Sequence, residues 1–237
     1  MLENIPLDKI LFLDIETVAQ QPDFNKVDER LQKFWEQKSK YIAPEETPED
    51  AYSRAGIYAE FGKIVCISVG FISYEGNRKT LRLKSFYGDD EKLLLEEFFE
   101  LLRNYFNSPN HLLCAHNGKE FDFPYIARRA LVNGLNIPSI LDLAGKKPWE
   151  VAHLDTLQLW KFGDYKNYTS LGLLTAIFNI PTPKDDIDGS MVNHVYWEEK
   201  DVERIKIYCE KDVVALTQLF LRYRNEPLIE EEDMVFN

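Results

Sequence analysis

The run ILFLD at residues 10–14 constrains this chain most, because an almost wholly apolar segment ends there in an acid. Such residues suit a buried strand, which we expect at 9–14. Side chains alternate faces along a strand, so Asp14 and Glu16 point the same way while Ile15 faces back into the protein. Two carboxylates on one face repel each other unless a cation or protons neutralise them. The alternative is a solvated pair of acids in a loop. The apolar run before the acids instead favours a partly buried position at the edge of the core.

A second group of polar residues follows another expected strand, HLLCAH at 111–116. Asn117 and the glycine after it are a sharp turn signal. From Phe121 the apolar spacing becomes helical, which predicts a helix at 121–133. Asp122 then lies near a helix N-terminus, where the macrodipole favours a negative charge. That complementarity alone would explain Asp122, and Asn117 is equally explained as a turn residue.

The third group lies on a long helix expected at 201–225, where apolar residues recur at helical intervals. Tyr208 and Asp212 are one turn apart on it and therefore share a face. A tyrosine at such a position is also commonly a core residue whose hydroxyl is satisfied at the edge. Because the chain also contains the other two acidic groups, we favour a site that Tyr208 and Asp212 share with those acids.

Together the three segments resemble the three exonuclease motifs of the DEDD superfamily in its tyrosine branch (DEDDy). Their sequences are LDIET, HNGKEFDFPYI and YCEKDVVAL. The chain is similar to the 3′–5′ proofreading exonuclease domain of B-family DNA polymerases and to stand-alone bacterial relatives of that domain. The histidine branch would place His five residues before the last Asp, where this chain has Ile207. The resemblance extends through FGKIVCISVGF, HLDTLQLWKFGDYKNYTSLGLLTAIFNIP and PKDDIDGSMV, and so covers most of the chain.

The resemblance implies an α/β, ribonuclease H-like fold: a mixed five-stranded sheet flanked by helices, with a helical insertion after the first strand at about 21–60. We expect one exonuclease domain at 1–225, an acidic C-terminal tail at 226–237, and no polymerase domain in this chain. The coarse pattern predicts strands at 9–14, 63–74, 79–87, 111–116 and 151–155. It predicts helices at 27–42, 89–106, 121–133, 169–178, 190–198 and 201–225. A further helix is expected to begin at Thr47 and Pro48.

The resemblance also implies roles for the five residues. Asp14, Glu16 and Asp212 would ligate one divalent cation, and Asp14 would bridge to a second that Asp122 reaches directly or through water. Tyr208 would hold the attacking water or also help to deprotonate it. Carboxylate oxygen suits Mg²⁺ or Mn²⁺, and two such ions stabilise the attacking and leaving oxygens of an in-line displacement. An unperturbed tyrosine pKa of about 10 favours a neutral orienting role over a general base.

We therefore expect a metal-dependent 3′–5′ exonuclease acting on single-stranded nucleic-acid 3′ ends, with DNA favoured over RNA. An RNA-trimming exoribonuclease and a catalytically weak module that binds nucleic acid or a partner protein are the alternatives. Oligomeric state stays open. Asp155 corresponds to a supporting position of the family rather than to a metal ligand.

The best candidate for substrate contact is KFGDYKNYTSLGLL, which interleaves aromatic and basic residues ahead of an expected helix. Aromatic rings can stack on unpaired bases, while lysines and helix N–H groups meet phosphate. A surface loop whose tyrosines close over the core is the alternative. The candidate substrate-binding residues are Thr17, Asn117, Phe121, Phe123, Tyr165, Lys166 and Tyr168.

The net charge of −12, from 40 acids against 28 bases, argues against a protein that coats duplex nucleic acid. An enzyme that grips a strand end needs few phosphate contacts, and cations such as Arg128 and Arg129 remain near the motifs. The three cysteines are far apart and fit buried small hydrophobes. No apolar run approaches the roughly 18 residues of a membrane span, and the N-terminus lacks a signal-peptide pattern, so we expect a cytoplasmic protein.

Overall fold

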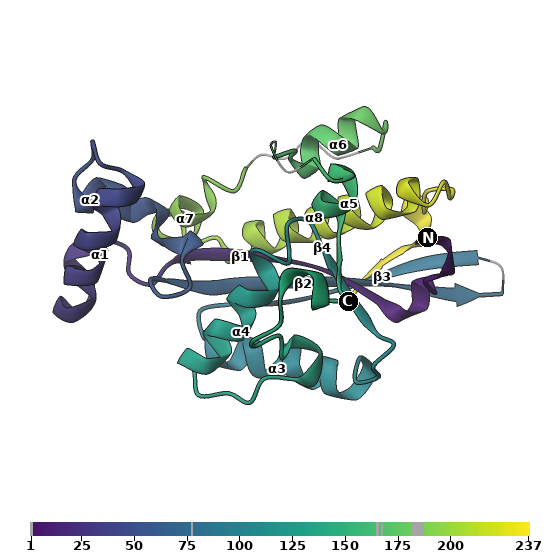
Figure 1. Cartoon of the computed structure of the whole chain (residues 1–237), viewed down its shortest axis with the longest axis horizontal. Coiled ribbons are helices and arrows are strands. Elements are labelled where there is room, and N and C mark those ends of the chain that lie inside the picture. Colours follow the sequence, from purple (N-terminus) through teal and green to yellow (C-terminus); the bar gives the residue numbers. More distant parts are fainter. Residues whose placement is uncertain (1, 77, 165, 167, 182–186) are drawn as a thin grey trace.

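The computed structural model describes every residue except 1, 77, 165, 167 and 182–186, and at its centre lies a mixed sheet (Figure 1). Its strands are ordered β5-β4-β1-β2-β3-β6. β1, β2 and β3 pair antiparallel, whereas β4, β5 and β6 are added in parallel. The strands are β1 (Ile10–Ala19), β2 (Gly62–Glu75), β3 (Arg78–Tyr87), β4 (Leu112–Ala115), β5 (Leu154–Asp155) and β6 (Met234–Phe236).

Helices flank both faces of this sheet, with α8 on one face and α3 and α4 on the other (Figure 1). The described helices are α1 (Glu29–Ile42), α2 (Pro48–Ala51), α3 (Glu91–Tyr105), α4 (Asp122–Val132), α5 (Thr156–Lys161), α6 (Leu171–Ile177), α7 (Val192–His194) and α8 (Val202–Tyr223). None of the helices that the structure describes is both long enough and apolar enough to cross a bilayer.

The alternation of β1 divides its side chains between two cores. Leu13 and Ile15 pack among the α3 and α4 residues, and Phe12 packs among those of α8. The ring of Phe12 meets that of Phe220 on α8 at 5.6 Å between centroids. Side chains at even positions of β1 therefore face α8, so the same alternation directs Asp14 toward that helix.

β1 is longer than the 9–14 expected from sequence. Its ladder with β2 continues to the pair Ala19–Gly62, with a register shift between Glu16 and Thr17. Pairing with β4, in contrast, stops at Phe12. The first two acids thus lie within a strand instead of after its end, along a stretch beyond its pairing with β4.

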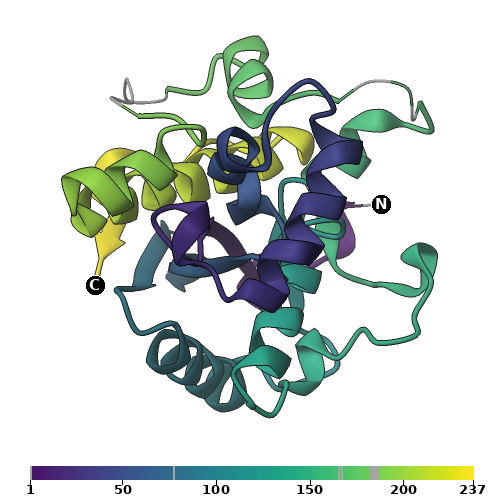
Figure 2. The same ribbon diagram turned by 90° about the vertical axis from the view of Figure 1, so that its left-hand side faces the viewer.

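The expected insertion after the first strand forms α1, α2 and the 3₁₀ helix Tyr52–Ile57, which face the viewer in Figure 2. Thr47 caps α2 by accepting a hydrogen bond from the Asp50 amide at 3.1 Å, and a proline occupies the first position, as predicted. Two contacts tie the insertion to α4. The Tyr125 hydroxyl donates to the Gly56 carbonyl at 2.6 Å, and Arg129 donates to the Ala59 carbonyl at 2.8 Å.

The Arg129 side chain is buried and donates to both carboxylate oxygens of Glu91, at 2.9 and 2.6 Å. Glu91 also accepts from the Ile64 amide at 2.7 Å, so this pair joins α3, α4 and β2. The sequence placed Arg129 among the cations available near the motifs. That interpretation is wrong for Arg129, because its charge is committed to an internal ion pair.

The C-terminal segment expected as an acidic tail contributes the sixth strand, which the sequence did not predict. β6 pairs with β3 along three residues, and an ion pair joins Arg78 to Asp233 beside it. Gln218 of α8 fixes the preceding chain by bonding both the amide and the carbonyl of Ile229. A three-residue strand next to a run of acids is too short for a sequence pattern to reveal.

Two helical segments also differ from expectation. The short α5 was not predicted, and Asp155 caps it by accepting from the amides of Leu157 and Gln158 at 3.0 and 3.2 Å. The helix expected at 190–198 splits into α7 and a π-helical turn, Val195–Glu199. Lys200 ends that turn in the left-handed conformation, at φ 59°.

Candidate active site

Two carboxylates leave β1 on the side that faces α8. One ligand atom each from Asp14, Glu16 and Cys209 can be chosen so that all lie within 4.8 Å of one another. Glu16 is buried, with 8% of its surface exposed, whereas Asp14 opens onto a cavity. Ile15 is buried on the opposite face. The shared direction of the two acids follows from strand alternation, as predicted.

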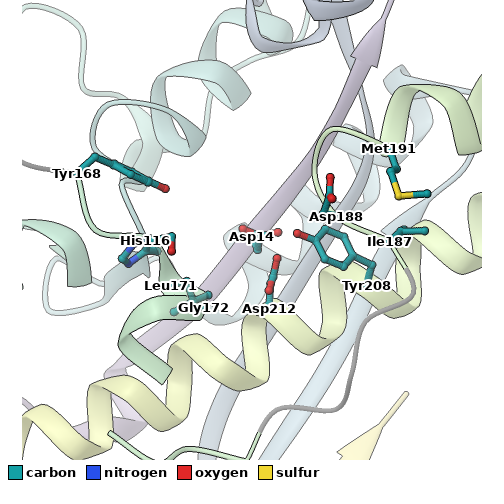
Figure 3. Close-up of a pocket in the computed structure, with 11 residues that line it drawn as sticks. Asp14, His116, Tyr168, Leu171, Gly172, Ile187, Asp188, Met191, Tyr208 and Asp212 are labelled. Atoms are coloured by element: carbon teal, nitrogen blue, oxygen red, sulfur yellow. The ribbon is translucent and has the colours of Figure 1, made fainter. Parts of the chain in front are cut away.

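Helix α8 brings the third motif against these acids. Tyr208 and Asp212 both line the cavity, and Figure 3 shows both side chains directed toward Asp14. The Tyr208 hydroxyl is hydrogen-bonded to the Asp212 side chain. Burial, followed by the charges of Asp212, Glu16 and Asp14, raises the pKa of Tyr208 well above its usual value. Burial and these neighbouring charges therefore favour the protonated hydroxyl.

Asp122 enters from the N-terminal turn of α4, where it is 3% exposed. A backbone hydrogen bond from Ile15 ties it to β1. Burial raises the pKa of Asp122 to about 7, with the charges of Asp155 and Asp212 adding to the rise and backbone hydrogen bonds opposing it. The charge of Asp122 in turn raises the pKa of Asp14. Three segments far apart in sequence thus converge.

The four acids of the motifs destabilise one another's charged forms. Burial raises the pKa of Asp14 well above its usual range, and Glu16, Asp212 and Asp122 raise it further, in that order. Burial also raises the pKa of Glu16, with Asp212 as the leading charge beside it. Carboxylate oxygens are the ligands that a hard divalent cation prefers, and the charge of such a cation would offset the repulsion.

The Cys209 thiol touches the same cluster, a contact that the sequence did not predict. Its Sγ donates to the Asp14 carboxylate Oδ2 and to the Asp14 carbonyl, each at 3.4 Å. Burial raises the pKa of this thiol well above its usual value, so it remains a neutral S–H donor. Its place next to Tyr208 in the third motif was the available signal, but only the packing of α8 on β1 reveals the contact.

Asp155 supports the turn that precedes Asp122. It accepts hydrogen bonds from the backbone amides of Asn117 at 3.0 Å and Lys119 at 3.1 Å, while also capping α5. Asn117 has a left-handed backbone, at φ 64°. The structure therefore gives Asn117 the turn geometry that its sequence indicated, and its contact with substrate stays a prediction.

Among the other predicted substrate contacts, the prediction for Phe123 is wrong. It is fully buried, with its ring 5.2 Å from that of His153, because α4 turns this side chain into the core. Phe121 is half-buried and packs on the Tyr125 ring at 5.3 Å. Thr17 is half-buried and hydrogen-bonded to the Tyr125 hydroxyl. Roles in substrate binding for Thr17 and Phe121 remain predictions.

Asp14 and Asp212 open onto a cavity of about 570 Å³ (Figure 3). Tyr168, predicted as a substrate contact, lines it and is 68% exposed. Lys166 is exposed, and Tyr165 lies outside the described residues. His116 stands beside Tyr168, held by hydrogen bonds of 2.9 Å each to the Thr156 hydroxyl and the Thr169 carbonyl.

The opposite wall of the cavity comes from a segment to which the sequence assigned no site residue. Ile187, Asp188 and Met191 line it on the side of Tyr208 (Figure 3). Asp188 accepts from the Ser190 amide at 2.8 Å, which fixes the local turn. An acid in PKDDIDGSMV was the visible signal, although spacing alone does not separate Asp188 from its acidic neighbours.

Residues 57–231 match the model of a family described as "Predicted 3'-5' exonuclease related to the exonuclease domain of PolB". The chain belongs to this family. No curated protein matches it. Among solved structures it is similar to the family B DNA polymerase from the hyperthermophilic archaeon Pyrobaculum calidifontis, with a TM-score of 0.52 and 13% identity over 92% of this chain. The chain spans 25% of that polymerase, and the likeness shows a shared ribonuclease H-like fold.

The family match contains the second and third motifs, but it begins after Asp14 and Glu16. The structure supplies the missing connection, since it places both acids against α8 beside Asp212. The sequence-based assignment to an exonuclease family related to B-family polymerases is thereby confirmed.

Proposed function

We propose that the chain is a DEDDy-type 3′–5′ exonuclease that hydrolyses single-stranded nucleic-acid ends with two divalent cations, Mg²⁺ or Mn²⁺. The observation that carries this proposal is the convergence of Asp14, Glu16, Asp122 and Asp212 in one group of interacting charges, of which Asp14 and Asp212 line the cavity with Tyr208. Residues 1–225 would form the catalytic domain, and DNA is the favoured substrate.

The four carboxylates, Asp14 foremost, would hold the cations. Bound cations would supply charge stabilisation for the attacking and leaving oxygens of an in-line displacement. Tyr208, kept protonated by burial and by the acids around it, would orient the attacking water through its hydroxyl. The Cys209 thiol would hold the Asp14 carboxylate in place. Tyr168, exposed on the cavity wall, offers a ring on which a terminal base can stack.

The test is hydrolysis of end-labelled single-stranded DNA and RNA by the full chain, with Mg²⁺, with Mn²⁺ and with excess EDTA. We expect mononucleotides to be released from the 3′ end, EDTA to abolish turnover, and either cation to restore it. Asp14→Ala should abolish activity, whereas Asp142→Asn, which removes an exposed acid that is not part of the cavity lining, should not. Full activity in EDTA would refute the metal site.

The same assay separates the alternatives. Faster hydrolysis of RNA than of DNA would indicate an exoribonuclease. Binding of the strand without hydrolysis under any cation would indicate the catalytically weak binding module. Equal cleavage of circular DNA would argue against an end-dependent enzyme.

A further inference from the structure

A second hollow, of about 440 Å³, shares one structural segment with the active-site cavity. Ile187 and Met191 line the cavity, and farther along the same segment Trp197 and Lys200 line this hollow. Lys63, Asp89, Tyr196 and Val202 complete its wall. We call these six residues the lysine hollow, and neither the exonuclease motifs nor the proposed mechanism uses them.

Two ammonium groups stand over one indole ring in the lysine hollow. The Lys63 Nζ lies 5.2 Å from the centroid of the Trp197 ring, and the Lys200 Nζ lies 4.9 Å from it. Lys63 donates to the Tyr196 hydroxyl at 2.7 Å, and that hydroxyl donates to Asp89 at 2.6 Å. Two lysine ammonium groups and the Asp89 carboxylate therefore meet in this hollow, on a chain whose net charge is −12.

Burial lowers the pKa of Lys63, and the nearby charge of Lys200 lowers it further, while Asp89 and Glu91 oppose the change. An anion placed between the two ammonium groups would act in the same direction as Asp89 and Glu91 and favour the charged form of Lys63.

The backbone of Lys200 supports a role for its side chain. It ends the π-helical turn in the left-handed conformation, at φ 59° and ψ 31°, where glycine is the ordinary residue. A lysine there costs backbone energy that glycine would avoid, and such outliers concentrate at functional positions. The side chain is exposed, so burial of its own apolar atoms does not offset that cost.

We propose that the lysine hollow binds a backbone phosphate of a single-stranded nucleic acid, upstream of the 3′ end held in the active-site cavity. This inference rests on the proposed exonuclease function. Lys63 of β2 pairs with Val18 of β1, and Val18 comes four residues after Asp14. At about 3.3 Å per residue of strand, the backbones of Lys63 and Asp14 are therefore about 13 Å apart along β1. A strand of a few nucleotides spans that separation. Two lysines and two aromatic rings form a sequence-independent grip of the kind that tracks a single strand.

The experiment compares hydrolysis of a long oligothymidylate with that of a thymidine dinucleotide, which is too short to reach the hollow. Lys63→Met and Lys200→Gly should each raise KM for the long strand about three- to tenfold and reduce its salt dependence by roughly one phosphate contact. kcat on the long strand and both constants on the dinucleotide should not change. Asp89→Asn keeps an oxygen that accepts from Tyr196 while removing the opposing charge, so it should lower KM for the long strand.

Lys84→Ala is the matched control, because Lys84 also stands over an aromatic ring, that of Phe86 at 4.9 Å, but lies outside the hollow. Lys200→Gly relieves the left-handed strain, so the variant should melt at or above the wild-type temperature, and a lost grip cannot then be attributed to unfolding. An unchanged KM in both lysine variants, or equal losses on the dinucleotide, would overturn the inference.

The failure of the proposed function would look different. If the wild type hydrolyses neither substrate, the exonuclease proposal fails, and fluorescence anisotropy with the same labelled oligothymidylate still measures the hollow. A second outcome would also overturn the strand inference. If thymidine monophosphate binds in a way that depends on Lys63 and Lys200, but neither residue affects binding of the strand, the hollow is a site for free nucleotides.

Discussion

Replacing Cys209 by alanine removes a single sulfur atom and, with it, the thiol donor to Asp14. The side chain is fully buried, and its Sγ lies 3.4 Å from the carboxylate oxygen that would hold cations. Because burial keeps the thiol protonated, the lost interaction is a hydrogen bond from a neutral donor to a charged acceptor.

The magnitude follows from this geometry. A hydrogen bond to a charged group contributes about 1.5–3 kcal/mol, and a thiol is a weak donor at 3.4 Å, so we take about 1.4 kcal/mol. That value is a tenfold change in cation affinity, at the lower end of the roughly 10–100-fold effects seen when a group that orients a metal ligand is removed. Deleting one buried heavy atom should also lower the free energy of unfolding by about 1 kcal/mol.

Isothermal titration of the metal-stripped protein with Mn²⁺ measures the affinity, and urea denaturation measures the stability. Cys114→Ala is the matched control, since Cys114 is equally buried but lies on β4 in the core between β1 and α8. It should cost similar stability and leave Mn²⁺ affinity unchanged, while Cys209→Ser should restore part of that affinity. Equal Mn²⁺ affinity in Cys209→Ala and Cys114→Ala would refute the argument.

Three further results are expected. Tyr208→Phe should lower kcat on single-stranded 3′ ends by about 10²–10⁴-fold in single-turnover assays while leaving Mn²⁺ affinity unchanged, because it removes only the orienting hydroxyl; a wild-type rate would make Tyr208 a packing residue. Arg129→Met should lower the free energy of unfolding, measured by urea denaturation, by about 3–5 kcal/mol, because it leaves the Glu91 carboxylate buried without its cation. The double variant with Glu91→Leu should recover much of that free energy. A loss below about 1 kcal/mol in Arg129→Met would contradict the argument. Burial lowers the pKa of His153, so the unfolded chain takes up a proton first and the free energy of unfolding should fall as pH drops below about 6.5; the same slope in His153→Gln would assign the effect elsewhere.

The directions of the candidate site side chains were predictable because they depend on the repeat of a single strand or helix. Asp14 and Glu16 share a face through the two-residue repeat of a strand, and Tyr208 and Asp212 share one through the turn of a helix. Both hold in the structure. Neither period requires knowledge of what packs on the other side, which is why the sequence was sufficient for them.

Other features depend on contacts between distant segments. Phe123 follows Asp122 directly, yet one step along a helix turns its side chain by about 100°, into the core. Arg129 is committed to Glu91, 38 residues away, and the sequence contains no mark of that pairing. The strand β6 forms because its residues meet the free edge of β3, not because of any pattern of its own.

The convergence of the acids carries its own argument about the cofactor. Burial and neighbouring charges, that of Asp212 among them, raise the pKa values of Asp14, Glu16 and Asp122, so a fold that brings these acids together without a cation works against their ionisation. Protonation would relieve the repulsion, but it would also remove the charges that hold a hard cation. The backbone hydrogen bond from Ile15 and the thiol of Cys209 instead favour ionised carboxylates on Asp122 and Asp14. Hydrogen-bond donors that favour charge, in a cluster whose burial disfavours it, support the proposal of a divalent cation among the acids.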